Sequence, residues 1–264
     1  MSLFTLRQSR RDDLFIVFEG PDGCGKTTQA NLLAESFRAA GREVILTREP
    51  GGTEVGERIR EILLNPDSQM GDMTELLLIF AARAEHVNKV IWPALMDGKV
   101  VICDRFTDST FAYQVGARQI PFAHFQVLCD MVVTQKPDLV IHLNNPDSQA
   151  RVDNRGQRDR MEQQGEAFDQ RMKAAYSEAA KGFPKVMTET PPLDQQHWHY
   201  PPHFDLLEGR RITLNASGDI PTVQRYVAKV MAAYLLYQKK HYVLSENLEA
   251  LIPSFQVQGF DPQL

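Results

Sequence analysis

The sequence predicts an α/β fold, a doubly wound five-stranded parallel sheet with helices on both faces. Two observations carry this prediction. Short apolar runs of strand length alternate with longer stretches whose apolar residues recur at helical spacing. Polar residues gather directly after the apolar runs, where ligands bind in parallel sheets. The 264 residues suffice for one large domain with appendages.

The elements follow one another along the chain in the order that such a sheet requires. The predicted strands cover residues 15–18, 44–47, 100–103, 139–143 and 211–214. The predicted helices cover residues 26–40, 54–64, 72–96, 122–135, 146–154, 163–181 and 221–237. We expect one domain over residues 1–237 and a C-terminal extension over residues 238–264. Residues 182–210 show no clear period, so we expect an insertion there.

Composition indicates a soluble intracellular protein. Hydrophobic residues make up 43% of the chain and charged residues 24%, which is ordinary for soluble domains. The net charge of −5 argues against broad electrostatic binding to nucleic acid. No apolar run approaches the roughly 20 residues that span a membrane. The 3 cysteines lack C-x-x-C spacing, so we expect reduced thiols and a cytoplasmic location.

A glycine-rich loop follows the first predicted strand and opens the first predicted helix. Its sequence, GPDGCGKTT, has the spacing G-x-x-x-x-G-K-[ST] of a P-loop. Glycines let backbone N–H groups turn toward phosphate oxygens, and the lysine reaches the outer phosphates. A turn without a ligand would leave Lys26 uncompensated. The predicted ATP phosphate-binding residues are Gly20, Gly23, Cys24, Gly25, Lys26, Thr27 and Thr28.

The third strand ends in an acidic and a basic residue, in the sequence VVICDRF. A carboxylate at this place fits an Mg²⁺ site, so we predict Thr27 and Asp104 as metal ligands. Arg105 can neutralise charge on a transferring phosphoryl group. The alternative is a buried Asp–Arg pair that only stabilises the strand end.

Arg48 ends the second strand, in the sequence TREPGGT. An arginine there can hold a phosphate with two hydrogen bonds, which indicates an acceptor that already carries a phosphate. The alternative is an ion pair with Glu49 or Glu54.

Arg83 shares an apolar helical stripe with Phe80. A buried arginine needs acceptors, and these are either a ligand or a structural partner such as Glu75 or Glu85.

An arginine-rich stretch over residues 151–162 separates two predicted helices. Such charge runs are usually solvated surface. The sharper hypothesis is a mobile lid whose arginine moves onto the phosphates and excludes water.

Taken together, these segments resemble the thymidylate kinase family. The matching motifs occur in the family's order and cover most of residues 14–181. They are the P-loop with an acidic residue, REPGGT, ELLL with AAR, DRF with AYQ, and the lid pattern RG with DR. The resemblance implies a fold of the P-loop kinase type and Mg²⁺-dependent phosphoryl transfer from ATP to dTMP. It also implies a homodimer.

The resemblance gives the acceptor residues their roles. Asp22 would hydrogen-bond the sugar 3′-hydroxyl of dTMP. Arg48 would hold its phosphate with Arg105 beside it, and Arg83 would bind the thymine. Tyr113 would crowd the sugar 2′ position, with Gln114 lining the same pocket. The implied dTMP-binding set is Asp22, Arg48, Phe80, Arg83, Arg105, Tyr113 and Gln114.

The chain departs from the family pattern at three places. Gly23 stands where some members have an arginine, so the resemblance is to members that supply this charge from the lid, with Arg155 as the expected residue and Arg158 and Arg160 as helpers. The position of the aromatic residue that stacks on thymine holds Ile79, so either Phe80 turns in or the base packs on an aliphatic surface. The loop AYQVGAR lacks two common glycines.

The expected catalytic residues are therefore Lys26, Asp104, Arg105 and Arg155, with ATP and dTMP as small-molecule partners. Two alternatives stay open at this point. One is another kinase of this fold that uses a deoxynucleoside or dUMP. The other is a nucleotide-binding relative without turnover.

Overall fold

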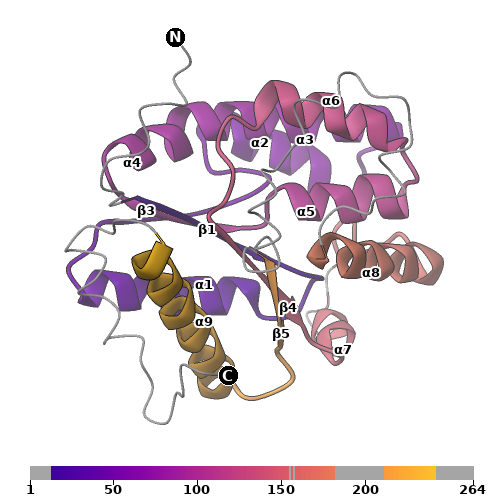
Figure 1. Cartoon of the computed structure of the whole chain (residues 1–264). Coiled ribbons are helices and arrows are strands. Elements are labelled where there is room, and N and C mark those ends of the chain that lie inside the picture. The colour runs from indigo at the N-terminus through magenta and orange to yellow at the C-terminus, as the bar shows by residue number, and fades with distance from the viewer. Residues whose placement is uncertain (1–12, 155, 157, 182–210, 242–264) are drawn as a thin grey trace.

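The structure is a computed structural model that describes residues 13–154, 156, 158–181 and 211–241 (Figure 1). Arg155, the insertion expected over residues 182–210 and residues 242–264 of the expected extension lie outside the described residues. Among the described residues, no helix is both long and apolar enough to cross a membrane.

Five parallel strands form one sheet in the order β2-β3-β1-β4-β5, which confirms the predicted architecture. The strands are β1 (Leu14–Glu19), β2 (Val44–Arg48), β3 (Val100–Asp104), β4 (Leu139–Asn144) and β5 (Arg211–Asn215). β1 is the central strand and is buried along its whole length. Because Phe18 of β1 lies opposite Asp104 of β3, the two central strands end side by side at one edge of the sheet.

The helices occupy most of the predicted stretches. They are α1 (Lys26–Ala39), α2 (Glu54–Leu64), α3 (Asp72–His86), α4 (Trp92–Met96), α5 (Thr107–Thr110), α6 (Phe122–Val132), α7 (Ser148–Asp153), α8 (Glu166–Ala180) and α9 (Ile220–His241). α2 has the predicted bounds, and α9 runs past the predicted domain end at residue 237. Predicted and observed ends of the other helices differ by a few residues.

Helices cover both faces of the sheet (Figure 1). Alternate residues of β1 point to opposite faces. Ile16 and Phe18 pack in a cluster with residues of α1 and α9, while Phe15 and Val17 pack against the segment that follows α3. A further cluster joins α3, α6 and α8, so the helices above the sheet have a core of their own.

Two stretches differ from the prediction. The helix predicted over residues 72–96 contains a π-helical turn, Val87–Ile91. Pro93 follows it, and because proline lacks an N–H and clashes with the carbonyl four residues earlier, the wider turn accommodates it. The second stretch, AYQVGAR, was expected as a loop, but α5 and a π-helical segment, Phe111–Ala117, make it helical. Packing against α8 overrides its weak helical signal.

Candidate functional site

The glycine-rich loop joins β1 to α1, as the motif requires. Gly20, Gly23 and Gly25 have positive φ angles of 134°, 76° and 101°, which only glycine adopts readily. Nζ of Lys26 donates a hydrogen bond to the carbonyl oxygen of Pro21 at 2.7 Å, so the buried lysine end lies against the loop. The loop thus has the backbone shape and the cation that phosphates bind.

The glycine at position 23 is required by packing as well as by backbone shape. A Cβ on Gly23 would lie 2.3 Å from the backbone oxygen of Ser148, at the start of α7. Since this neighbour is backbone and not a flexible side chain, any larger residue would displace the loop or the helix. An arginine at position 23 is therefore incompatible with this arrangement.

Thr27 and Asp104, the predicted metal ligands, are adjacent. The Thr27 hydroxyl donates to Oδ2 of Asp104 at 2.5 Å. Oδ1 of Asp104 is buried and has no hydrogen-bond partner among the described residues. A buried carboxylate oxygen with no donor fits a cation, and Mg²⁺ in phosphate sites takes few protein ligands. The described residues contain no cluster of three or more His, Cys, Asp or Glu that could hold a metal by themselves. The remaining metal ligands would therefore be phosphate oxygens and water.

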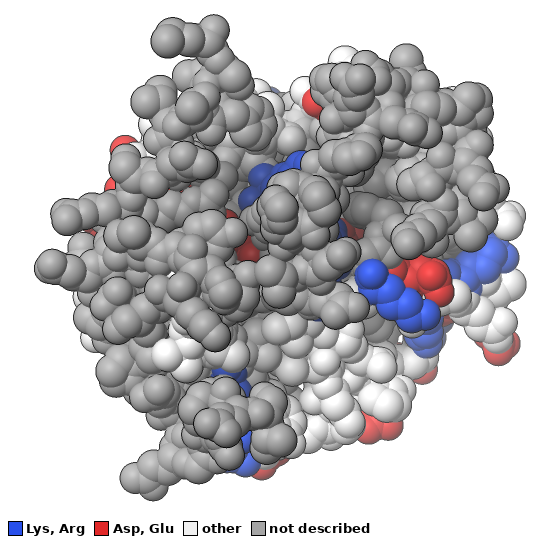
Figure 2. Space-filling model, viewed as in Figure 1, with Lys and Arg blue, Asp and Glu red and all other residues white. Residues whose placement is uncertain are grey.

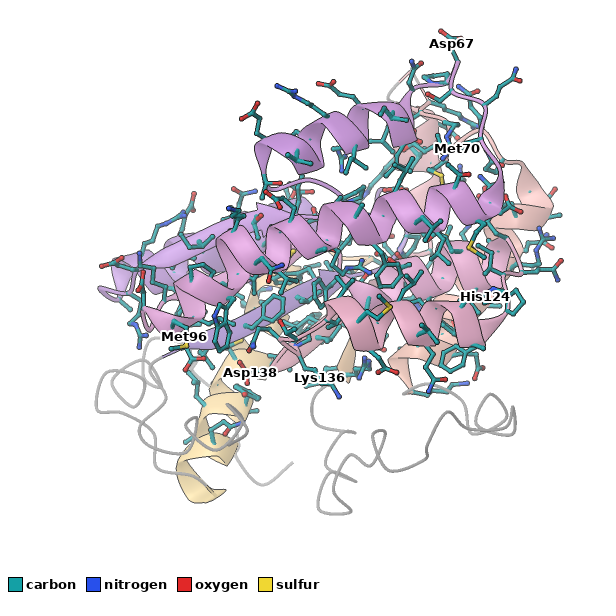
Figure 3. All side chains as sticks on the ribbon, turned by 90° about the horizontal axis from the view of Figure 1, so that it is seen from above. Asp67, Met70, Met96, His124, Lys136 and Asp138 are labelled. Carbon is teal, nitrogen blue, oxygen red and sulfur yellow. The ribbon has the colours of Figure 1, made fainter. Side chains whose placement is uncertain are left out.

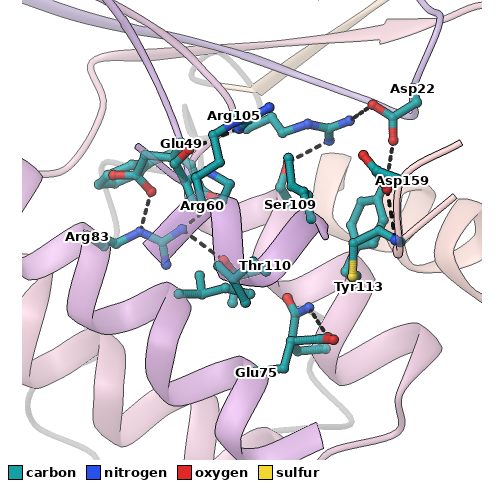
Figure 4. Close-up of a pocket in the computed structure, with 17 residues that line it drawn as sticks. Asp22, Glu49, Arg60, Glu75, Arg83, Arg105, Ser109, Thr110, Tyr113 and Asp159 are labelled. Atoms are coloured by element: carbon teal, nitrogen blue, oxygen red, sulfur yellow. Dashed lines mark hydrogen bonds and ion pairs between the residues drawn. The ribbon is translucent and has the colours of Figure 1, made fainter. Parts of the chain in front are cut away.

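A pocket opens beside the phosphate loop (Figure 4). Its lining comes from the loop, from the ends of β2 and β3, from helices α2, α3 and α5, from the π-helical segment Phe111–Ala117, and from the stretch before α8. The residues most relevant to ligand binding are Asp22, Glu49, Arg60, Glu75, Ile79, Arg83, Arg105, Ser109, Thr110, Tyr113 and Gln114. Asp22 and Arg105 connect this pocket to the phosphate loop and to Asp104.

Arg83 lies at the pocket wall and is almost fully buried. Its Nε donates to Oε2 of Glu49 at 2.7 Å, and its Nη2 donates to the Phe106 carbonyl and to the Thr110 hydroxyl at 3.0 and 2.8 Å. The structural partner is thus Glu49 and neither Glu75 nor Glu85. Nη1 of Arg83 has no partner in the described part of the chain, so a donor remains for a ligand.

Phe80 does not line the pocket, contrary to the expectation that it could turn in. It is buried, with its ring edge-on to Phe125 and 4.9 Å from the Arg83 guanidinium carbon. Ile79 lines the pocket instead. The surface offered to a flat ligand here is therefore aliphatic, and Phe80 supports Arg83 from the core.

Arg105 and Asp22 form an ion pair at the junction of loop and pocket. Arg105 also donates to the Gly20 carbonyl and to the hydroxyls of Ser109 and Tyr176. Its φ of 73° is rare for a residue other than glycine. Residues with such unusual backbone angles are found most often at functional sites. Burial would raise the pKa of Asp22, but Arg105, Lys26 and the Tyr113 hydroxyl outweigh it, so the pKa is lowered and the carboxyl is charged at neutral pH.

Arg48 is not brought into the pocket. Its side chain is about half exposed and pairs with Oε2 of Glu57 at 2.8 Å. The residue that lies in the pocket is Arg60 of α2, whose Nη1 donates to the Pro50 carbonyl. Burial lowers the pKa of Arg60, and the charges of Arg48 and Arg105 lower it further. Arginines that repel one another in this way favour an anion between them.

The lid arginines have different partners. Arg158 pairs with Asp153 at the surface. Arg160 is buried, donates to the Leu63 carbonyl at 2.7 Å and pairs with Glu75. Arg160 therefore anchors the base of the predicted lid and is not available to reach the loop, contrary to its expected helper role.

Three acidic residues of the site received no role in the site from the sequence, although Glu49 and Glu75 were considered as ion-pair partners. Glu19 is the last residue of β1, so the rule that ligands bind at the carboxyl ends of parallel strands could have identified it. It accepts hydrogen bonds from the backbone N–H groups of Phe106 and Ser109, and burial raises its pKa. Glu49 follows β2 and also accepts from His86 at 2.9 Å. Glu75 carries no such signal, because it lies on a helix far from any strand end.

Comparisons with known proteins point to one family. A model of the family described as thymidylate kinase matches residues 18–196. Thymidylate kinases of Pseudomonas fluorescens (strain Pf-5) and Pseudomonas putida (strain F1) are 51% and 48% identical over 176 residues, which are 65% of this chain and 84% of each relative. The crystal structure of thymidylate kinase from Ehrlichia chaffeensis superposes with a TM-score of 0.53 at 37% identity, covering 64% of this chain and 85% of that one.

Proposed function

This chain belongs to the thymidylate kinase family, which uses ATP to phosphorylate dTMP to dTDP, and from that premise we propose how its residues perform the transfer. The observation that carries the proposal is that the phosphate loop and the pocket beside it, the two places suited to phosphate groups, share a border. Asp22 and Arg105 line the pocket and also contact the phosphate loop. A donor and an acceptor nucleotide can therefore meet at this border.

The donor binds at the phosphate loop. The backbone N–H groups of residues 20–28 surround the ATP phosphates, and Lys26 exchanges its bond to the Pro21 carbonyl for phosphate oxygens. Since Gly23 leaves no room for an arginine in the loop, a charge from elsewhere must reach the transferred group. Arg155 is the proposed source, and it lies outside the described residues.

The acceptor binds in the pocket. Arg83 offers its unpartnered Nη1 to the thymine, Ile79 packs against the ring, and Gln114 lines the same wall. Asp22 accepts a hydrogen bond from the sugar 3′-hydroxyl. Tyr113, held by Asp22 at 2.7 Å, crowds the place of a ribose 2′-hydroxyl.

We propose that the dTMP phosphate lies between Arg60 and Arg105. Both line the pocket, whereas Arg48 faces Glu57. We therefore give the phosphate role to Arg60 and leave Arg48 as the residue that orders Glu57.

The residues that would hold Mg²⁺ are Thr27, through its hydroxyl, and Asp104, whose Oδ1 has no donor among the described residues. When bound, this ion would neutralise charge on the ATP phosphates. Phosphate oxygens of dTMP are already nucleophilic at neutral pH, so the chain needs no strong base. Lys26, Arg60 and Arg105 supply the rest by positioning the two phosphates and offsetting their charge.

A homodimer is also part of the proposal. Exposed apolar residues recur at helical spacing on three helices of the layer above the sheet, seen from above in Figure 3. They are Val55 and Ile62 of α2, Met73 and Leu77 of α3, and Val127 and Met131 of α6. A second copy would cover them.

On the face shown in Figure 2, basic and acidic side chains of the described residues lie near one another.

A cytoplasmic location completes the proposal. All three cysteines are free and buried, as is usual in a reducing compartment.

A panel of acceptors tests the function. ADP formation is measured with ATP, Mg²⁺ and dTMP, dUMP, dCMP or thymidine. We expect dTMP to be the preferred acceptor. Lys26→Ala should lower kcat by about 100-fold or more, since it removes a charge that stabilises the transition state. Lys173→Ala, at an exposed position of α8, is the matched control and should keep wild-type turnover. ATP binding without turnover of any acceptor would contradict the proposal.

A further inference from the structure

Glu75 is a buried carboxylate at the floor of the acceptor pocket (Figure 4). It lies in the first turn of α3 and is 1% exposed. Oε1 accepts hydrogen bonds from Nε2 of Gln114 at 2.8 Å and from Nε of Arg118 at 3.2 Å. Oε2 accepts from Nη2 of Arg118 at 3.0 Å and from Nη2 of Arg160. Both oxygens are therefore occupied by donors.

The charge of Glu75 decides how the Gln114 amide is turned. Burial would raise the pKa of Glu75, but hydrogen bonds from Arg118, Gln114 and Arg160 outweigh it, so the pKa lies below that of an ordinary glutamate. A charged carboxylate can only accept hydrogen bonds. The amide must therefore direct its NH₂ group toward Glu75. Its Oε1 is left over, and no described residue donates to it.

The pocket then presents a defined pair of groups to a base. Nη1 of Arg83 has no hydrogen-bond partner among the described residues. Gln114 lines the same pocket, and its one side-chain hydrogen bond to a described residue is the bond that Nε2 donates to Glu75, so Oε1 is the acceptor left for a base. Thymine offers the complement, an acceptor at O4 and a donor at N3–H. Cytosine offers the opposite, a donor at its 4-amino group and an acceptor at N3. If the Gln114 amide were reversed, its NH₂ group would suit cytosine N3.

We propose that Glu75 is a positioning residue for base selection, which holds the Gln114 amide so that its oxygen faces the base and thereby favours thymine over cytosine. The proposal rests on the proposed binding of dTMP in this pocket. Glu75 itself does not touch the reacting atoms. The same carboxylate binds Arg160, so it also fixes the base of the lid stretch against α3.

The variant Glu75→Gln tests the proposal, because a neutral amide of the same shape can donate as well as accept. It no longer fixes the Gln114 amide. We expect the ratio of kcat/KM for dTMP to that for dCMP to fall about tenfold, the worth of one hydrogen bond. The ratio for dTMP to dUMP should stay unchanged, since uracil has the same hydrogen-bonding edge as thymine. A merely structural defect would lower all three values together and move neither ratio.

Arg160→Gln is the matched control. It breaks the contact between Glu75 and the lid stretch but leaves the bond between Glu75 and Gln114. Turnover should fall for every acceptor, and the dTMP to dCMP ratio should remain that of the wild type. A fall of this ratio in Arg160→Gln equal to that in Glu75→Gln would overturn the inference, as would a folded Glu75→Gln variant with wild-type selectivity.

A second measurement needs no Glu75 variant and so remains informative if that variant does not fold. In the wild-type chain labelled with ¹⁵N-glutamine, the Gln114 amide protons should exchange slowly with water before dTMP is added. Fast exchange that becomes slow only with dTMP would show the NH₂ group facing the base and would refute the inference. Failure of the wild type to phosphorylate dTMP would instead count against the proposed function.

Discussion

Arg83 is a buried charge, and one of its nitrogens, Nη1, has no partner among the described residues. Its other donors reach Glu49, the Phe106 carbonyl and the Thr110 hydroxyl. Leaving a buried donor without an acceptor costs about 1–3 kcal/mol, so proteins rarely retain one without a use. The site can recover that free energy only when an acceptor arrives. The same reasoning applies to Oδ1 of Asp104, a buried acceptor with no donor among the described residues, where we propose that Mg²⁺ binds.

Arg60 and Arg48 offer a direct comparison at the residue scale. Arg60→Ala should raise KM for dTMP by about 10- to 100-fold, because it removes a charge-assisted hydrogen bond to the acceptor phosphate. Arg48→Ala should change KM by less than about threefold, because Arg48 is half exposed and pairs with Glu57. Steady-state kinetics with dTMP at saturating ATP measures both. The reverse order of effects would return the phosphate role to Arg48.

At the scale of elements, the phosphate loop is fixed by its neighbours. Gly20 approaches the backbone oxygen of Leu143 at the end of β4, and Gly23 approaches that of Ser148 in α7. The loop between β1 and α1 therefore keeps its shape through contacts with the next strand and helix of the sheet. Such preorganisation lowers the ordering cost of binding ATP.

Two glycines with similar φ angles allow the energetic cost of backbone strain to be measured separately from the cost of a steric clash. Gly41 has a φ of 79° and open space where a Cβ would lie, whereas Gly23 has a φ of 76° and a backbone oxygen there. We expect Gly41→Ala to lower the free energy of unfolding by about 1 kcal/mol, from backbone strain alone. Gly23→Ala should cost about 3 kcal/mol, since the clash is added. Urea denaturation compares the two, and equal losses would show that the loop yields easily.

At the scale of the whole molecule, the helical layer above the sheet is both the wall of the pocket and an apolar surface. α2 and α3 contribute Arg60, Glu75 and Arg83 to the pocket and also carry exposed apolar residues. A partner on that surface would therefore brace the helices that hold dTMP.

The mass in solution tests this arrangement. Light scattering should give about twice the 30.0 kDa mass of the chain. Leu77→Glu places a charge on the apolar surface of α3 and should shift the protein toward the monomer without unfolding it, because Leu77 is 50% exposed. Met96→Glu, at an exposed methionine of α4, is the control and should stay dimeric. A monomeric wild-type chain would contradict the proposed dimer.

The sequence was sufficient for the sheet, the phosphate loop and the pairing of Thr27 with Asp104, because each depends on short-range spacing and on the rule for strand ends. It was insufficient for Arg48, Phe80 and Arg160. Their side-chain directions depend on partners in other elements, Glu57, Phe125 and Glu75, that the spacing of residues within one element does not reveal. The helical segment around Tyr113 was missed for the same reason, since α8 stabilises it.

Arg105 has a consequence for how selectivity can evolve in this chain. Its guanidinium donates to the Gly20 carbonyl, to Asp22 and to Tyr176, so in the proposed complex it lies beside both nucleotide sites. We therefore expect a substitution of Arg105 to alter the affinities for donor and acceptor together. New substrate preferences are therefore expected to arise at the opposite end of the pocket, around Glu75, where the phosphates are out of reach.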